Sequence, residues 1–329
     1  MLEHYELLGT DIGVGASGRK IERFGRYVVD RPAVIASSPA ANVAPRGAPA
    51  HPRPRSQEGS GEPTSGATAD LSSSADFVYD RTAPAASGRW LRTDGTPLDA
   101  PVSWEIGVDA LTFELRLTDS GQVGLFPEQA DNWRWIAGEL AKLAAASDSR
   151  DEPPRVLNLF AYTGASTLAA AAAGAQVVHV DAARPAVEWA RLNAELSGLA
   201  AAPIRWLVDD ARAFVDRELR RGRQYTGVIL DPPSYGHGVK RTDWRLERDL
   251  PALVSSCRDL LSVGPAFLLL TCHTTGVTAA RLGEWFFDAT GLTPTDLGDM
   301  NLVARSGATL PSGVCVRWSG EVASEPSPK

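Results

Sequence analysis

Apolar residues in the second half of the chain form short uninterrupted runs that alternate with longer segments of helical periodicity. The runs are VLNLF (156–160), VVHVD (177–181), IRWLV (204–208), GVILD (227–231) and AFLLLTC (266–272). Short continuous apolar runs are typical of strands that are buried on both faces. Strands that alternate with helices favour a parallel sheet joined by right-handed crossovers.

The segments between these runs predict helices over 166–173, 185–196, 211–220, 244–261 and 278–289. Gly174 and Gly198 follow the first two segments, as is common just past a helix C-terminus. Two β-prone runs near 300–304 and 314–318 flank a turn-rich loop and predict a C-terminal antiparallel hairpin. We therefore expect an α/β protein with a Rossmann-like, doubly wound, mostly parallel sheet of seven strands.

The first half of the chain predicts a smaller, β-rich unit. Short β-prone segments separated by turn residues indicate a small antiparallel sheet and lie at 77–79, 89–92, 102–108 and 111–117. A helix is expected over 127–145, because Pro127 suits a first helical turn. The expected organisation is an N-terminal β segment (1–36), a small β-rich domain (76–150), the main α/β domain (151–320) and a flexible tail (321–329).

Residues 37–75 differ in composition from the rest of the chain. Pro, Ala, Ser and Gly dominate this segment, and large apolar residues are nearly absent. Such a segment cannot bury enough apolar surface to offset the entropy cost of ordering it. We expect a disordered, low-complexity insertion there.

Composition and charge exclude several classes of protein. The formal net charge of −7 excludes a globally basic nucleic-acid coat, although local basic patches remain possible. The three cysteines lie far apart and the histidines lack ligand spacing, so we expect neither a disulfide framework nor a metal site. The sequence shows no signal peptide and no apolar run long enough to span a membrane, which predicts a cytoplasmic protein that does not enter membranes.

Polar residues follow the predicted parallel strands at the point where each strand ends. Gly164 follows the first strand, Asp181 ends the second, Asp209 and Asp210 follow the third, and Asp231 follows the fourth. Ligands of open parallel sheets bind beyond the carboxyl ends of the strands. The sequence therefore predicts one ligand site at this edge of the sheet.

The turn after the first strand favours a cofactor without a pyrophosphate. A dinucleotide fingerprint carries three glycines that let the backbone approach a pyrophosphate, whereas AYTGAS (161–166) has only Gly164. S-adenosylmethionine, which has no phosphate, needs less of that approach. Asp181 suits the ribose hydroxyls and Asp210 the adenine amino group, but each acid could instead cap a helix. An NAD-dependent oxidoreductase would share the fold and Asp181, so it remains an alternative.

The run Asp231-Pro232-Pro233-Ser234-Tyr235 is the most specific motif. Two successive prolines fix φ near −65° and remove two amide donors, and the residue before them is held extended. A stiff loop of this kind can present its carbonyl groups and Tyr235 to a planar acceptor base. The alternative is an ordinary rigid turn.

Together these motifs resemble the class I S-adenosylmethionine-dependent methyltransferases, and more narrowly the large-subunit ribosomal RNA cytosine-5 methyltransferases. The matching segments are GQVGLFPEQADNWRWI (121–136), VLNLFAYTGAS (156–166), VVHVDAARPAVEWARLNAELSGL (177–199), VDDARAFV (208–215) and GVILDPPSY (227–235). The resemblance implies S-adenosylmethionine as cofactor, bound within residues 151–320 and by a contact from the segment before them. The implied cofactor residues are Phe160, Tyr162, Thr163, Gly164, Ala165, Asp181, Asp209, Asp210 and Gln129.

The resemblance also implies a ribosomal RNA substrate and a set of residues that act on it. Asp231 and Cys272 are the implied catalytic residues, and the implied substrate contacts are Pro232, Pro233, Tyr235, Lys240 and Arg241. Methylation at cytosine C5 needs a thiolate that attacks the ring. Cys272 could supply it, or could be a buried small apolar side chain. Because Ser234 separates the prolines from Tyr235, the motif departs from the DPPY pattern of exocyclic-amine methyltransferases, and the acceptor atom stays open.

Basic residues form three local groups in this acidic chain. They are Arg19, Lys20, Arg23 and Arg26; Arg217, Arg220, Arg221 and Arg223; and Lys240, Arg241, Arg245 and Arg248. Each group could position RNA phosphates, or could be a solvated face with interleaved acids. A catalytically inactive module that binds RNA is a further alternative for the whole chain.

Overall fold

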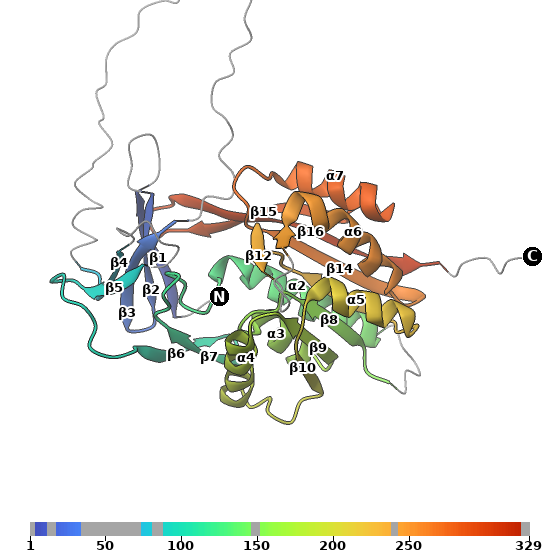
Figure 1. Ribbon diagram of the computed structural model, residues 1–329, viewed down its shortest axis with the longest axis horizontal. Helices are drawn as coiled ribbons and strands as arrows, with labels where there is room; N and C mark the ends of the chain where they lie inside the picture. Colours follow the sequence, from blue (N-terminus) through green and yellow to red (C-terminus); the bar gives the residue numbers. More distant parts are fainter. Residues whose placement is uncertain are drawn as a thin grey trace, which may run out of the picture.

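Figure 1 shows the fold of the chain in a computed structural model. The structure describes residues 4–11, 18–33, 74–80, 88–145, 152–237 and 243–323. The predicted insertion at 37–75 lies outside these ranges except for its last two residues. Lys240, Arg241 and residues 324–329 of the predicted tail also lie outside them.

A seven-stranded sheet forms the centre of the molecule, in the order β10-β9-β8-β11-β14-β16-β15. Adjacent strands are parallel from β10 to β14, whereas β16 runs antiparallel to both of its neighbours. This arrangement confirms the predicted α/β fold with its C-terminal antiparallel hairpin. The strands are β8 (Arg155–Leu159), β9 (Gln176–Asp181), β10 (Ile204–Val208), β11 (Gly227–Leu230), β14 (Gly264–Cys272), β15 (Asp296–Val303) and β16 (Thr309–Val322).

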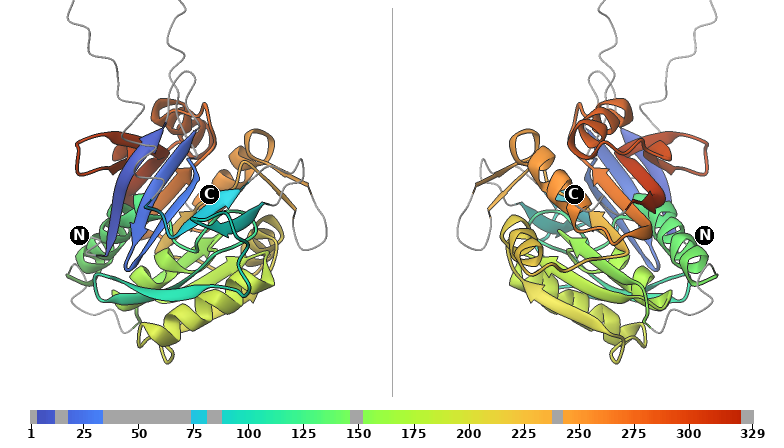
Figure 2. Two further views of the ribbon diagram at one scale, coloured as in Figure 1. Left: turned by 90° about the vertical axis from the view of Figure 1, so that its left-hand side faces the viewer. Right: turned by 90° about the vertical axis from the view of Figure 1, so that its right-hand side faces the viewer.

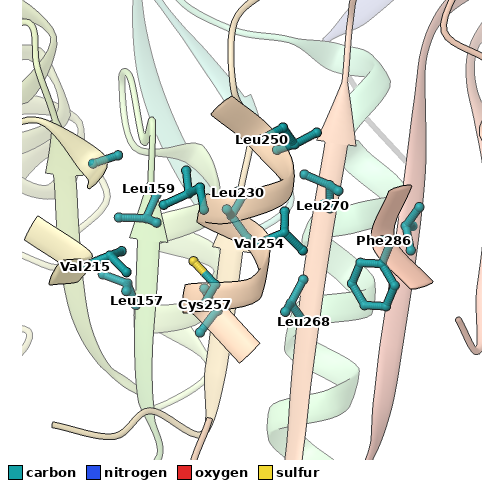
Figure 3. Close-up of a cluster of buried hydrophobic side chains, with 14 of the residues drawn as sticks. Leu157, Leu159, Val215, Leu230, Leu250, Val254, Cys257, Leu268, Leu270 and Phe286 are labelled. Carbon is teal, nitrogen blue, oxygen red and sulfur yellow. The ribbon is translucent and has the colours of Figure 1, made fainter. Parts of the chain in front are cut away.

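Alternate residues of the central strands face two different layers of helices. Val228 and Leu230 of β11 lie in one buried cluster, which Figure 3 shows with Val254 and Phe286 from the covering helices. Ile229 lies in the cluster on the opposite face. The short 3₁₀ helix η1 (Pro127–Gln129) precedes the helices, which are α2 (Ala130–Ala145), α3 (Ala165–Ala172), α4 (Arg184–Leu196), α5 (Ala211–Arg220), α6 (Leu246–Asp259) and α7 (Ala279–Thr290).

The predicted helix over 244–261 is too long at its N-terminal end. Asp243–Arg245 forms strand β13, which pairs antiparallel with β12 (Tyr235–His237). The indole of Trp244 is buried and donates a hydrogen bond to the Pro233 carbonyl at 2.7 Å. This long-range contact holds Trp244 in an extended segment, and α6 begins only at Leu246.

The N-terminal sheet has five strands in chain order, and it joins segments from both sides of residues 34–73. Its strands β3 and β4 pair in parallel, with Val29 opposite Phe77. The segments predicted to form one small antiparallel sheet over 77–117 do pair antiparallel, β4 with β5 and β6 with β7, but they belong to two separate sheets. The strands are β1 (Tyr5–Asp11), β2 (Arg19–Phe24), β3 (Tyr27–Pro32), β4 (Phe77–Asp80), β5 (Arg89–Arg92), β6 (Ser103–Val108) and β7 (Leu111–Arg116).

The N-terminal sheet packs against the α/β part of the chain. Phe24 and Phe77 share a buried cluster with Trp133 of α2 and Ala194 of α4. A parallel bridge between Leu7 and Ala304 joins β1 to the end of β15. Figure 2 shows the blue strands of this sheet beside the red C-terminal strands. The start of the described chain therefore lies beside the segment that follows β15.

Gly124, in the segment between β7 and η1, lies very close to α4. Its φ is +97°, and a Cβ there would lie 2.3 Å from Cζ2 of buried Trp189. We expect Gly124→Ala to lower the free energy of unfolding by about 2–4 kcal/mol, because overpacking costs about 1–3 kcal/mol and a left-handed non-glycine residue costs about 1–2 kcal/mol. Urea titration measures this change. Gly138→Ala, at an open position on α2, is the control and should raise stability by about 0.5–1 kcal/mol. Equal effects of the two substitutions would contradict this prediction.

Candidate active site

A cavity of about 710 Å³ lies at the carboxyl ends of the central strands. This volume is within the range of about 300–1,000 Å³ that is usual for small-molecule sites. The predicted residues that line it are Phe160, Tyr162, Asp181, Asp209, Asp210, Asp231, Pro232 and Pro233. The cavity thus brings together the residues that follow four separate strands.

The loop after β8 has a strained backbone that tertiary contacts hold in place. Phe160 and Tyr162 have φ of 56° and 48°, in the left-handed region that L-residues adopt at a cost of about 1–2 kcal/mol. The Tyr162 amide donates to Oδ2 of Asp181 at 2.8 Å, and the Thr163 hydroxyl donates to the Gly124 carbonyl at 2.7 Å. Strain of this kind is concentrated at functional sites.

Gly164 and Ala165 join this loop to helix α3 and do not line the cavity. Gly164 caps the N-terminus of α3 with φ of +90°, and a Cβ there would lie 3.0 Å from Cβ of Ala190. Ala165 begins the helix behind it. Therefore Thr163, Gly164 and Ala165 shape the loop, while the side chains of Phe160 and Tyr162 reach the cavity.

Asp181 combines an internal structural contact with a position on the cavity wall. Its Oδ1 accepts a hydrogen bond from the Ala183 amide at 2.8 Å, while Oδ2 accepts the Tyr162 amide. Burial raises the pKa of Asp181, and the two amides oppose this rise. Each carboxylate oxygen can accept a second hydrogen bond. Asp181 can therefore hold the loop and still accept hydrogen bonds from two ribose hydroxyls.

Asp209 and Asp210 line the cavity, and both already have protein partners. Oδ1 of Asp210 accepts from the Ala213 amide at 3.1 Å, so this residue caps α5. Asp209 forms an ion pair with Arg217 and accepts the amide of Asp210 at 2.9 Å. The helix-cap alternative therefore holds for Asp210, and any contact with an adenine would be additional.

Asp231 lies at the centre of a buried hydrogen-bond network. The Thr271 hydroxyl donates to its Oδ1 at 2.6 Å, and Nε2 of His273 lies 3.4 Å from the same oxygen. Burial alone would raise the pKa of Asp231, but the charge of His273 and the hydrogen bonds lower it. Burial alone would lower the pKa of His273, but Asp231 raises it to about 9. At neutral pH the pair is a carboxylate beside an imidazolium.

Gln129 contacts Asp231 and does not line the cavity. Its Nε2 donates to Oδ2 of Asp231 at 3.1 Å, and its Oε1 accepts from Asn132 at 2.6 Å. Arg317 in turn donates to Oδ1 of Asn132 at 2.6 Å. The chain from Arg317 to Asp231 fixes the orientation of the carboxylate from behind.

The Pro-Pro loop is held rigid by contacts beyond its own sequence. Trp244 bonds to the Pro233 carbonyl, and its ring lies 5.1 Å from that of Phe160. The Ser234 hydroxyl lies 2.7 Å from that of Thr274. Tyr235 is 55% exposed on β12 and stands outside the cavity lining. Asp231, Pro232 and Pro233 therefore form one fixed wall, with an exposed aromatic ring beyond it.

Cys272 is fully buried in the cluster around β14, and it does not line the cavity. Burial raises the pKa of its thiol, while a hydrogen bond from the Thr274 amide opposes the rise. A nucleophilic cysteine needs the thiolate form and access to its substrate. This placement favours the alternative of a small apolar side chain.

The basic residues near the cavity have acidic partners within the described part of the chain. Arg245 pairs with Asp243, and Arg248 pairs with Asp249. Arg221 likewise pairs with Glu218. These pairs are those of a solvated face with interleaved acids.

Sequence reasoning did not place Lys20, Arg31, Glu128 or Ser312 at this site, although all four line the cavity. They come from β2, β3, η1 and β16, far from the central motifs in the chain.

A cluster of three or more His, Cys, Asp or Glu side chains suited to a metal ion is absent from the described ranges. Among the helices within those ranges, none is both long and apolar enough to cross a membrane.

The fold and the cavity define an α/β protein with a small-molecule-sized cavity at the carboxyl edge of its parallel sheet. Residues 62–282 match the sequence pattern of the S-adenosylmethionine-dependent methyltransferases. The chain therefore belongs to the S-adenosylmethionine-dependent methyltransferase family. This confirms the cofactor prediction and replaces the oxidoreductase alternative.

Solved structures agree with this assignment. A SAM-dependent methyltransferase from Agrobacterium tumefaciens is 29% identical, with a TM-score of 0.74 over 97% of this chain and 91% of that one. A Streptococcus mutans protein, described as a candidate SAM-dependent methyltransferase, shares the fold with a TM-score of 0.68 at 18% identity, over 97% of this chain and 76% of that one.

Curated relatives match part of the chain. Ribosomal RNA large subunit methyltransferase K/L from Shewanella loihica is 32% identical over 184 residues, which are 55% of this chain and 23% of that protein. Ribosomal RNA large subunit methyltransferase I from Aeromonas salmonicida is 30% identical over 141 residues, which are 43% of this chain and 32% of that protein. The chain thus spans about a quarter to a third of these relatives.

Proposed function

We propose that the protein transfers a methyl group from S-adenosylmethionine to a base of ribosomal RNA. The fixed wall of Asp231, Pro232 and Pro233 beside the cofactor cavity is the observation that carries this proposal. The names of the two curated relatives, both ribosomal RNA methyltransferases, support the choice of substrate. Action on ribosomal RNA would place the protein in the cytoplasm.

The residues around the cavity suit the binding of both reactants. S-adenosylmethionine, when bound, supplies a methyl group on a positively charged sulfur atom. Asp181 would accept the ribose hydroxyls, and Phe160 and Tyr162 would contact the rest of the cofactor. Well-oriented reactants gain effective molarities of about 10⁵–10⁸ M, so orientation can provide much of the rate.

Asp231 would orient the acceptor. Its carboxylate has further lone pairs that can accept a hydrogen bond from a base N–H, and the adjacent proline carbonyl can accept another. Thr271, Gln129 and His273 keep that carboxylate ionised and fixed. A nitrogen acceptor attacks with its own lone pair and needs no thiolate, which agrees with the burial of Cys272.

The proposal predicts that Cys272→Ala keeps methyl transfer within about threefold of the parent protein. Full-length protein is incubated with tritiated methyl donor and with ribosomal RNA from cells that lack it, and modified nucleosides are identified by mass spectrometry. A methylated base nitrogen is the expected product. Loss of transfer by the folded variant, with 5-methylcytidine as parent product, would restore the covalent cytosine C5 mechanism.

The same experiment separates an enzyme from an inactive module. Binding of S-adenosylhomocysteine is measured in parallel by calorimetry. If the protein binds this product yet labels no RNA pool, the proposed activity is wrong and the inactive RNA-binding alternative is favoured.

A further inference from the structure

Two basic side chains from the N-terminal sheet form part of the cavity wall. Lys20 on β2 lies directly opposite Arg31 on β3 in the strand register. They are only 6% and 3% exposed, and both line the cavity. Like charges directly opposite each other on paired strands are destabilising. A buried pair of this kind therefore needs a compensating anion.

Glu22 supplies part of that compensation. One of its carboxylate oxygens lies 3.0 Å from Nζ of Lys20, and the other lies 2.6 Å from Nε of Arg31. Burial alone would raise the pKa of Glu22, but Arg31 and Lys20 lower it to about 2, so it is ionised. The Tyr5 hydroxyl donates to the same carboxylate at 2.9 Å. The Glu22 carboxylate thus serves both cations, and the charge of Glu128 also raises the pKa of Arg31. Both cations keep donors for a further acceptor.

Glu128 on η1 lines the same cavity, and its carboxylate lacks a hydrogen-bond donor. Its side chain is 6% exposed, and its buried Oε2 has no hydrogen-bond partner. Its Oε1 lies 3.8 Å from Nδ1 of His273. Buried polar atoms are nearly always hydrogen-bonded, so an exception at a cavity wall indicates a missing donor.

Glu128 lies close to the loop after β8. The ring of Phe126, two residues before Glu128, lies 5.6 Å from that of Tyr162 and 5.7 Å from that of His273. η1 therefore covers the space between the loop after β8 and the Asp231 network. Asp181, Asp209 and Asp210 line the cavity at the ends of β9 and β10, where the proposed function puts the nucleoside. The wall formed by η1, β2 and β3 would then face the other end of the cofactor.

We propose that Lys20 and Arg31 bind the α-carboxylate, and Glu128 the α-ammonium, of the amino-acid end of S-adenosylmethionine. A zwitterion supplies both missing partners at once, the anion for the cations and the donor for the carboxylate. An RNA phosphate would suit Lys20 and Arg31 but would be repelled by Glu128, so the zwitterion is favoured. This inference rests on the cofactor of the proposed function, and it does not depend on the methyl acceptor.

The test compares two ligands that differ only in this part. S-adenosylhomocysteine carries the amino-acid end, whereas 5′-methylthioadenosine keeps the nucleoside and the sulfur and lacks it. We expect Lys20→Met and Glu128→Gln each to weaken S-adenosylhomocysteine binding by roughly 10–100-fold, the usual effect of losing a charge-assisted hydrogen bond. Binding of 5′-methylthioadenosine should change by less than about twofold. Calorimetry on the full-length protein measures both affinities.

Two further variants control for fold and charge. Lys20→Arg keeps the cation and should retain most of the affinity for S-adenosylhomocysteine. Arg23→Met removes a half-exposed cation from the same strand and should leave both affinities unchanged. The melting temperature of each variant shows whether it is folded.

Three results would overturn the inference. Equal weakening of both ligands would indicate a general loss of cavity shape. Unchanged binding of both ligands would show that the cations do not touch the cofactor. Unchanged S-adenosylhomocysteine binding, with weaker RNA binding and a shallower salt dependence, would assign Lys20 to an RNA phosphate. If the variants weaken S-adenosylhomocysteine binding but not 5′-methylthioadenosine binding, and the parent protein still transfers no methyl group to RNA, only the proposed function would be wrong.

Discussion

Asp231→Ala is expected to slow methyl transfer by at least about 100-fold, while S-adenosylhomocysteine binding weakens much less. The substitution removes the carboxylate that would orient the acceptor, and Thr271 and Gln129 lose their shared partner. It also removes the nearer of the two carboxylates that lie beside His273. Loss of one positioned charged group at a reacting centre typically costs about 10²–10³-fold in rate. Single-turnover transfer of a tritiated methyl group to ribosomal RNA measures the effect.

Asp131→Ala is the matched control for this substitution. Asp131 lies on the first turn of α2 and its side chain is 84% exposed. Its removal should leave the single-turnover rate unchanged. If Asp231→Ala retained a rate within about threefold of the parent protein, the acceptor-orienting role of Asp231 would be wrong.

Asp181→Ala is expected to weaken S-adenosylhomocysteine binding by roughly 10–100-fold. Hydrogen bonds to a charged group contribute about 1.5–3 kcal/mol, and each 1.4 kcal/mol is a factor of ten in affinity. The substitution removes the acceptor for ribose hydroxyls, and it also frees the Tyr162 and Ala183 amides that hold the strained loop. Calorimetric titration with the product measures the dissociation constant.

Glu188→Ala tests whether this effect is specific. Glu188 is an exposed acid on α4, the helix that follows Asp181. The Glu188→Ala variant should bind S-adenosylhomocysteine with the same dissociation constant as the parent protein. A dissociation constant that Asp181→Ala leaves unaltered would show that this carboxylate supports only the loop and makes no contact with the cofactor.

The parallel sheet could be predicted because its strands are buried on both faces. Val228 and Ile229 are adjacent in sequence, yet they face different helical layers, so both positions must be apolar. The acids at the ends of these strands directly follow the apolar residues in the sequence, so the same pattern locates them. For this reason the sequence predicts both Asp181 and Asp231 at one edge of the sheet, and the structure places both on the cavity wall.

Contacts between distant segments could not be predicted in the same way. Trp244 fits a helical pattern, but its hydrogen bond to Pro233 and its contact with Phe160 draw it into a strand. Lys20 belongs to a group of basic residues that suggests an exposed face, and only strand pairing with Arg31 shows that it is buried. Gln129 is implied as a cofactor contact, but its side chain bonds to Asp231. No local sequence pattern reveals this contact.

The bridge between Leu7 and Ala304 has a consequence for biosynthesis. One wall of the cavity comes from β2 and β3, whereas Ser312 comes from β16, the last strand of the described chain. A nascent chain that stops short of β16 lacks this part of the pocket. The ribosome must therefore synthesise everything from β2 to β16 before this cavity is complete, and deletion of either β2 or β16 would remove part of its lining.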